Sequence, residues 1–517
     1  MAVEGAAGDS SSIRPSFRAP LVITGIFFVS RIAFFAAGVR FDMGAITGPE
    51  SYWQVLDLHQ LQHNLVQSIW YLQSQPPLFN TFTGMILHLP AGMRGPVLVT
   101  SSLALGLALA LSCYYLSLEL RLPHWLSLLL TVLVVLDPAT VLYENWYFYS
   151  FPTAVVITFC ALCVARYVRT KSSMWGLCFF GSLMTIVLLN SAFQWIWLVV
   201  ATAVVFVVFR HRWKSVLIVA SVPIALVSVW YVKNAVIFQT YTTSSWIGMN
   251  LANVTLVHAN PRQLAKLLSE KKLSPLAVEG PFAPLSAYGH ALTGHGATGV
   301  VVLDQRTKGD GSVNFNNINY INISNRYLHD DLVYIKAYPA SYVHEVVSAT
   351  ELFFQPQEQY VYLGPNANRI SGYLVPYNLF VDLQAHTSNF APPAGKVRHL
   401  SWEQMSMSAV LIYGLAMLVA PFAIWRQRRD LPFAITLAFI WMSTVYVFVI
   451  TSLGEFGENM RFRYDLGPLP MVAAAAVVVA LCTRTRETAS IDNQRPYDDL
   501  VAPPGCRSRP LIIPPLA

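Results

Sequence analysis

The sequence predicts an all-α protein that crosses a membrane many times. Of its 517 residues, 55% are hydrophobic and only 12% are charged, whereas soluble chains carry about 25% charged residues. The mean hydropathy is +0.47, and the apolar residues form long blocks separated by short polar segments. This composition excludes a soluble enzyme, a disordered chain and a small disulfide-stabilised scaffold.

Ten apolar blocks are long enough to be spans, because a helix needs about 20 apolar residues to cross the hydrocarbon core. A further block, 76–92, is shorter and begins with Pro76-Pro77. We therefore expect ten to eleven spans. The ten blocks cover residues 20–39, 95–118, 125–142, 151–168, 174–190, 192–209, 215–232, 407–425, 432–452 and 467–483.

The distribution of charge predicts the orientation. The net charge is +7, and the basic residues cluster between blocks, near 169, 212 and 428, as in cytoplasmic loops that follow the positive-inside rule. Both termini are then cytoplasmic and the acidic stretch 40–75 lies outside. Parity requires 76–92 to be half-crossing or re-entrant, unless Arg94 or Arg121 breaks the rule. We see no basic stripe interleaved with aromatics, so we expect no nucleic-acid partner.

Five regions follow from these boundaries. The loop 233–405 is large enough for a small domain, and its Gly, Pro and Asn content indicates an irregular fold with a few helices, such as 326–349. The expected regions are a cytoplasmic tail (1–19), a transmembrane catalytic core with its outer loop 40–75 (20–232), an extracytoplasmic loop domain (233–405), C-terminal transmembrane helices (406–483) and a disordered cytoplasmic tail (484–517).

The first outer loop carries the acidic residues best suited to chemistry. Asp42, Glu50 and Asp57 precede an aromatic and polar run, 70–80, that contains the double proline. Asp57 lies in a half-apolar stretch whose aromatic residues suit the membrane interface. A carboxylate held there could act as a general base towards a hydroxyl or amine acceptor. His59 and His63 share one helix face beside Asp57, and we interpret them as interface histidines.

This pattern resembles the GT-C superfamily of membrane glycosyltransferases, which includes protein O-mannosyltransferases and lipid A aminoarabinose transferases. The resemblance implies a GT-C-like helix bundle, a polyprenyl-phosphate sugar donor on the outer face, and no bound metal or cofactor. In that family the catalytic acid typically precedes Pro-Pro-Leu by about twenty residues, and Asp57 precedes Pro76 by about that distance. Many members have an Asp-Glu pair there, whereas Leu58 follows here, so Asp42 or Glu50 could be the base instead. Further segments that look like members of this group are 142–149, 230–234, 244–250 and 458–464.

Three basic residues are candidates to bind the donor phosphate. Arg461 and Arg463 lie between the last two spans, where a guanidinium fork could stabilise the departing polyprenyl phosphate. They could instead pair with Glu455, Glu458 or Asp465, or mark a cytoplasmic loop. Lys233, at the outer end of its span, is the third candidate, and its alternative is snorkelling to the interface.

Other polar residues could support the acceptor. Glu144 could position the acceptor or be an ordinary loop carboxylate, and Gln75 and Asn80 flank the double proline. Arg31 lies near the middle of the first span, where an arginine costs at least about 2.5 kcal/mol. It should therefore face the bundle interior and have a partner, which we expect to be structural.

The sequence thus predicts an inverting membrane glycosyltransferase. It would move a sugar from a polyprenyl-phosphate donor to a glycan, lipid or protein acceptor, with an extracytoplasmic active site in the lipid bilayer of a plasma, inner or endoplasmic reticulum membrane. One alternative is a lipid-linked polysaccharide polymerase or ligase. Another is a transporter or flippase, although we see no inverted repeat of the kind common in transporters.

Overall fold

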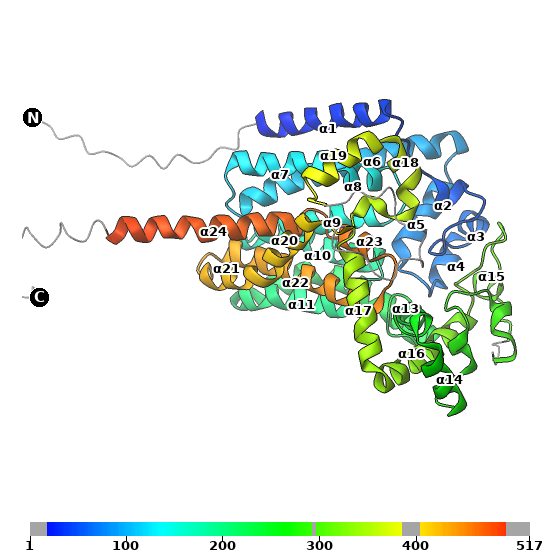
Figure 1. Cartoon of the computed structure of the whole chain (residues 1–517). Coiled ribbons are helices and arrows are strands. Elements are labelled where there is room, and N and C mark those ends of the chain that lie inside the picture. Colours follow the sequence, from blue (N-terminus) through cyan, green and yellow to red (C-terminus); the bar gives the residue numbers. More distant parts are fainter. Residues whose placement is uncertain (1–17, 292–295, 385–403, 493–517) are drawn as a thin grey trace, which may run out of the picture.

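A computed structural model describes residues 18–291, 296–384 and 404–492, and this part of the chain is built from helices. Its β-pairing is limited to two isolated bridges, so the predicted all-α class is confirmed. The apolar helices lie side by side in one bundle (Figure 1). They are α1 (Arg18–Ala36), α6 (Ala91–Glu119), α7 (His124–Leu136), α8 (Pro138–Glu144), α9 (Ser150–Thr170), α10 (Ser173–Leu189), α11 (Trp195–Val208), α12 (Trp213–Phe238), α20 (Met407–Gly414), α21 (Ala420–Arg426), α22 (Leu431–Gly454) and α24 (Leu469–Asp492).

Every predicted block coincides with helix in this bundle, but the helices differ in length. By length and composition, six are able to cross a membrane, or up to seven when the bent pair α7 and α8 counts as one span. The remaining apolar helices, α10, α11 and the apolar part of α24, are shorter. With 14 residues, α11 reaches about 21 Å, less than the roughly 30 Å of hydrocarbon. The chain is therefore a multi-pass membrane protein, but six or seven of its described helices are long enough to cross, fewer than the ten to eleven spans expected from the sequence.

The two ends of the bundle are different. α1 begins and α24 ends at the same end, on the left in Figure 1. Basic residues gather there: Arg166 and Arg169 pair with Glu119, and Arg121 pairs with Asp430. At the opposite end, α5 (Pro77–Leu87) has only 11 residues, about 16 Å. The helix in block 76–92 is thus too short to be a full span. This agrees with the expectation, from the side on which the basic clusters lie, that the block crosses the membrane only part of the way.

The predicted span 125–142 is broken at Pro138. Asp137 caps α8 by accepting hydrogen bonds from the backbone N–H of Ala139 and Thr140, at 3.3 and 2.9 Å. Proline has no N–H for the helix ladder, and the two helices meet at a bend of 55°. The bend turns the C-terminal residue of α8, Glu144, towards α1.

The end of the bundle opposite the start of α1, called the outer end after the orientation predicted from the charges, carries two groups of short helices. α13 packs on α16 around Trp246, Phe315 and Tyr327, apart from the main core of the bundle. The first group is formed by the first outer loop, 40–75, with α2 (Gly44–Thr47), α3 (Leu58–His63) and α4 (Leu65–Trp70), and by the following helix α5. The loop domain contains α13 (Ile247–Val254), α14 (Pro261–Ser269), α15 (Val301–Asp304), α16 (Asn319–Ala337), α17 (Pro339–Phe353), α18 (Gly364–Arg369) and α19 (Ser371–Phe380).

Two expectations for polar segments need correction. The single helix predicted over 326–349 is two helices, α16 and α17, because Pro339 starts a new helix at its first position. The tail predicted to be disordered from residue 484 begins as helix, since α24 continues to Asp492. The rest of that tail, and nearly all of the N-terminal tail, lie outside the described residues. The end of the 233–405 loop also rejoins the bundle, where Phe353, Tyr360 and Ile370 lie in the main core.

Candidate functional site

The first outer loop and the loop domain are tied together by buried polar contacts. Asp57 caps α3, with Oδ1 accepting from the backbone N–H of Gln60 at 2.9 Å, and its Oδ2 accepts from the backbone N–H of Gly309. The Lys308 ammonium donates to the carbonyl of Tyr52 at 2.9 Å. Burial lowers the pKa of Lys308 to about 8, although nearby carboxylates oppose this. These contacts fix the loop domain over the outer end of the bundle.

A cavity of about 650 Å³ lies between the outer end of the bundle and the loop domain. Pockets for small molecules are usually lined by aromatic and apolar side chains with a few polar groups, and this cavity follows that rule. Its aromatic walls include Trp53, Trp146, Trp246, Phe282 and Tyr362. The stacked rings of Trp146 and Phe148, 4.4 Å apart, form one wall.

Segments far apart in the sequence converge on this cavity. Gln75 comes from the run before the double proline, Trp146 from 142–149, Trp246 from 244–250, and Arg461 from 458–464. Four of the five segments that carry the GT-C resemblance therefore line one space. The exception is 230–234, which contributes no lining residue.

The charged side chains among the described lining residues all come from one short segment, 455–461. Arg461 is 2% exposed, and its Nε and Nη2 donate to Glu458 Oε2 at 3.0 and 2.5 Å. Its Nη1 donates to the hydroxyl of Ser150 at 3.3 Å, and the Tyr360 hydroxyl donates to Glu458 Oε1 at 2.8 Å. Arg461 and Glu458 thus form an ion pair at the cavity wall, the pairing left open by the sequence.

Arg463 does not join Arg461. Residues two apart on a helix point roughly 200° apart, so Arg463 faces the other side of α23 (Asn459–Tyr464). There it lines a smaller cavity of about 160 Å³ with Asp137 and Asp382, and its Nη2 donates to the carbonyl of Gln355 at 3.1 Å. A shared phosphate between the two arginines is therefore inconsistent with this geometry.

Lys233 and Glu144 lie away from the cavity and have other partners. The Lys233 ammonium donates to the carbonyl of Leu72 at 2.8 Å and lies 3.6 Å from the centre of the Trp230 ring. Glu144 binds Arg31 through two guanidinium nitrogens, at 2.5 to 3.1 Å. The prediction that Arg31 has a partner inside the bundle is confirmed.

The remaining polar candidate, Asn80, holds the backbone of the cavity wall by hydrogen bonds. Its side-chain oxygen accepts from the backbone N–H of Leu56 at 2.8 Å, and its nitrogen donates to the carbonyl of Gln54 at 2.9 Å. Because Gln54 lines the cavity, Asn80 positions the lining backbone without itself reaching the space.

The three acids of the first outer loop lie near the cavity but do not line it. Both oxygens of Asp57 are taken by backbone N–H groups. Asp42 Oδ1 accepts from the backbone N–H of Gly44 at 2.7 Å, and its backbone pairs with Trp146. Glu50 is exposed. Glu455, expected from the sequence only as a possible partner for the arginines, does line the cavity. Its place there depends on the fold of a loop, which sequence spacing does not reveal.

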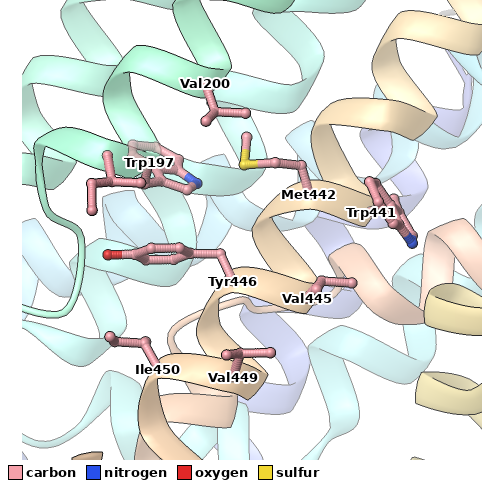
Figure 2. Close-up of a pocket in the computed structure, with 9 residues that line it drawn as sticks. Trp197, Val200, Trp441, Met442, Val445, Tyr446, Val449 and Ile450 are labelled. Atoms are coloured by element: carbon pink, nitrogen blue, oxygen red, sulfur yellow. The ribbon is translucent and has the colours of Figure 1, made fainter. Parts of the chain in front are cut away.

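An apolar groove of about 330 Å³ runs between α11 and α22 (Figure 2). Figure 2 shows Trp197 of α11 facing Tyr446 of α22, and Val200 of α11 facing Met442 of α22. The groove approaches the cavity at its outer end, since Ile450 of the groove lies five residues, about 7 Å, before Glu455 of the cavity.

Comparison with known proteins gives similarity to solved structures alone. No family model and no curated protein sequence matches the chain. The Archaeoglobus fulgidus oligosaccharyltransferase in its apo form is 11% identical with a TM-score of 0.38, over 91% of this chain and 52% of that one. The same values hold for the archaeal oligosaccharyltransferase AglB from that organism in complex with an inhibitory peptide and a dolichol-phosphate, over 96% and 53%.

The chain thus spans about half the length of these enzymes. At this identity and TM-score the superposition assigns no role to any residue here. The chemistry considered for this chain therefore rests on its own residues.

Proposed function

We propose that this chain is a membrane glycosyltransferase that moves a sugar from a polyprenyl-phosphate donor to an acceptor in the cavity at the outer end of the bundle. The observation that carries the proposal is the convergence of segments 70–80, 142–149, 244–250 and 458–464 on that one space. These segments come from four different parts of the chain and share the GT-C resemblance.

The cavity has the features that a lipid-linked sugar needs. Its aromatic walls provide flat surfaces for the apolar faces of a sugar ring, and Gln75, Asn250 and Asn253 provide polar groups for hydroxyls. The groove between α11 and α22 offers an apolar path for the prenyl chain, because its lining is almost entirely apolar and it leads towards the cavity. The phosphate would then lie where groove and cavity meet.

Arg461 is the residue that we assign to the phosphate. Its Nη1 donates to the hydroxyl of Ser150 at 3.3 Å, a distance longer than the usual 2.7–3.2 Å. This nitrogen is the part of the guanidinium best placed to turn to a phosphate oxygen, while Glu458 holds the other side. As the bond between the anomeric carbon and the phosphate oxygen breaks, the phosphate gains charge, which a fixed guanidinium stabilises.

The reaction would proceed as one displacement. A carboxylate takes the proton of the acceptor, the acceptor atom attacks the anomeric carbon from the side opposite the phosphate, and polyprenyl phosphate leaves with the bonding electrons. The configuration of the sugar is thereby inverted. The acids of the first outer loop, Asp57, Asp42 and Glu50, are the candidates that the sequence offers for this carboxylate.

The test is donor turnover by the purified protein in lipid nanodiscs. Polyprenyl-phosphate hexoses and pentoses are supplied, and released polyprenyl phosphate is measured by mass spectrometry. We expect release from at least one donor, and we expect Asn253→Trp, which fills the cavity, to reduce it at least tenfold. Val222→Trp, at a lipid-facing site 64% exposed on α12, is the matched control and should retain the wild-type rate. Equal turnover by both variants would refute the assignment of the site, and absence of turnover with every donor would refute the function.

A further inference from the structure

The last outer loop places a second carboxylate, Glu455, at the wall of the cavity. Glu455 directly follows α22, where its N–H donates to the carbonyl of Thr451 at 3.1 Å. The buried Asn459 side chain donates to the carbonyls of Thr451 and Glu455, at 3.0 and 3.1 Å, and accepts from the N–H of Gly457 at 3.1 Å. Gly457 has a φ of +103°, a region that side-chain-bearing residues rarely adopt. The loop therefore holds Glu455 in one fixed place.

One oxygen of Glu455 is available to a ligand. Oε1 accepts from the backbone N–H of Phe456 at 3.2 Å, and no hydrogen bond from any described residue reaches Oε2. The neighbouring acid is occupied, since Glu458 binds both Arg461 and Tyr360. Among the carboxylates that line the cavity, Glu455 is thus the one with a free oxygen.

The surroundings of Glu455 suit proton transfer near neutral pH. Burial raises the pKa of Glu455, the adjacent Glu458 raises it further, and Arg461 opposes them. The other titratable groups lining the cavity around it are His258 on the loop-domain side and the phenols of Tyr360 and Tyr362. A general base works best when its pKa lies near the working pH. A carboxylate in bulk water, with a pKa of about 4.3, is a much weaker base.

The first-loop acids are less well placed. Asp57 has both oxygens bound to backbone N–H groups, and removing one would break the junction with the loop domain. Asp42 and Glu50 do not line the cavity. From these contacts we infer that Glu455 is the catalytic residue that accepts the proton of the acceptor in the proposed reaction.

This inference rests on the proposed function and assigns one of its steps. The acceptor hydroxyl or amine loses its proton to Glu455 Oε2 as its oxygen or nitrogen forms the bond to the anomeric carbon. The bond from that carbon to the phosphate oxygen breaks, and polyprenyl phosphate leaves with the electron pair beside Arg461. Glu455 then releases the proton to water, so no oxidant, reductant or further reactant is needed.

The experiment compares Glu455→Gln with variants of the three other acids: Asp57→Asn, Asp42→Asn and Glu50→Gln. Each is assayed in nanodiscs with the polyprenyl-phosphate sugar that the wild type turns over, and thermal unfolding checks its folding. We expect kcat of Glu455→Gln to fall by about 10²- to 10⁴-fold, with affinity for polyprenyl phosphate unchanged within about twofold. Glu270→Gln, an exposed carboxylate paired with Lys272 in the loop domain, is the matched control and should keep full activity.

The pH profile distinguishes a proton acceptor from a structural residue. The wild-type rate should rise with pH as Glu455 loses its proton, and the residual rate of Glu455→Gln should lack this rise. Glu455→Asp, which keeps the carboxylate but shortens the side chain, should recover part of the activity. A folded Glu455→Gln with a rate within about threefold of wild type would overturn the inference. A large fall in kcat in a folded Asp57→Asn, Asp42→Asn or Glu50→Gln, in place of Glu455→Gln, would also overturn the inference. The proposed function would then still stand. A wild type that consumes no polyprenyl-phosphate sugar overturns both.

Discussion

The ion pair between Arg31 and Glu144 gives the sharpest prediction about the stability of the bundle. Both side chains are almost completely enclosed, with 7% and 1% exposed, and Arg31 lies inside the first span. Its Nε donates to both carboxylate oxygens at 3.0 and 3.1 Å, and its Nη2 donates to Oε2 at 2.5 Å. Without Glu144 the guanidinium would keep its hydrogen bonds to the carbonyl of Val135 and the hydroxyl of Ser30 and its contact with the Phe27 ring, none of which is a counter-charge.

Glu144→Gln should therefore leave a buried charge without a counter-charge. Removing one partner of a buried pair costs about 3–5 kcal/mol, whereas replacing both partners by apolar residues is often close to neutral. We expect Glu144→Gln to lower the free energy of unfolding by about 3–5 kcal/mol. The double variant Arg31→Met with Glu144→Met should lose clearly less than the sum of the two single methionine variants.

The assay is unfolding in mixed detergent micelles, with the fraction unfolded followed as the share of denaturing detergent rises. A double-mutant cycle over Arg31→Met, Glu144→Met and their combination gives the coupling energy, which should exceed about 2 kcal/mol. Independent sites add within about 0.3–0.5 kcal/mol. Additive losses within that range would refute the reasoning, because they would mean that the pair contributes no coupling to the bundle.

Three further predictions concern the outer end and its junction with the bundle. Gly248→Ala should destabilise the loop domain, because the added Cβ would lie 1.9 Å from a carbonyl oxygen of α16. Gly181→Ala is the control and should not, because its added Cβ would meet no neighbouring side chain or other segment within 4 Å. Hydrogen exchange of α13 and α16 measures the effect of both variants. Burial raises the pKa of Asp331 to about 8, despite a hydroxyl hydrogen bond, so the folded state holds a proton that the unfolded state has lost above about pH 4. Loop-domain stability should then fall between pH 4 and pH 8, and Asp331→Asn should abolish that fall in thermal unfolding; an unchanged pH dependence would contradict it. Lys233→Met should destabilise the protein by about 1–3 kcal/mol, since it leaves the carbonyl of Leu72 unpaired. The affinity for polyprenyl phosphate should stay the same. A tenfold loss of that affinity would instead indicate that Lys233 binds the phosphate.

The sequence predicts the bundle well because hydrophobic burial in a membrane is encoded locally. Each apolar block became helix, and the cost of a charge in a span was enough to predict a partner for Arg31. Sequence could not predict which partner, since Glu144 lies more than a hundred residues away and reaches Arg31 only through the bend at Pro138.

The site was predicted less completely, for physical reasons that particular residues show. Arg461 and Arg463 are neighbours in sequence, but the short helix α23 points them into different cavities. The resemblance to GT-C enzymes favoured Asp57 as the catalytic acid, yet its contact with Gly309 links it to a segment 252 residues away. Whether a carboxylate is free or used as a cap depends on such long-range contacts.

The most direct test of the central claim is photo-crosslinking with a polyprenyl phosphate that carries a diazirine next to its phosphate. The protein is labelled in nanodiscs, digested, and mapped by mass spectrometry. The account predicts that labelled peptides come from 142–149, 244–250 and 455–462, which line the cavity, and that excess unlabelled polyprenyl phosphate prevents the labelling. The result that would contradict the proposed site is labelling confined to the basic loops near 169, 212 and 428, at the other end of the bundle, if excess unlabelled polyprenyl phosphate also prevents that labelling.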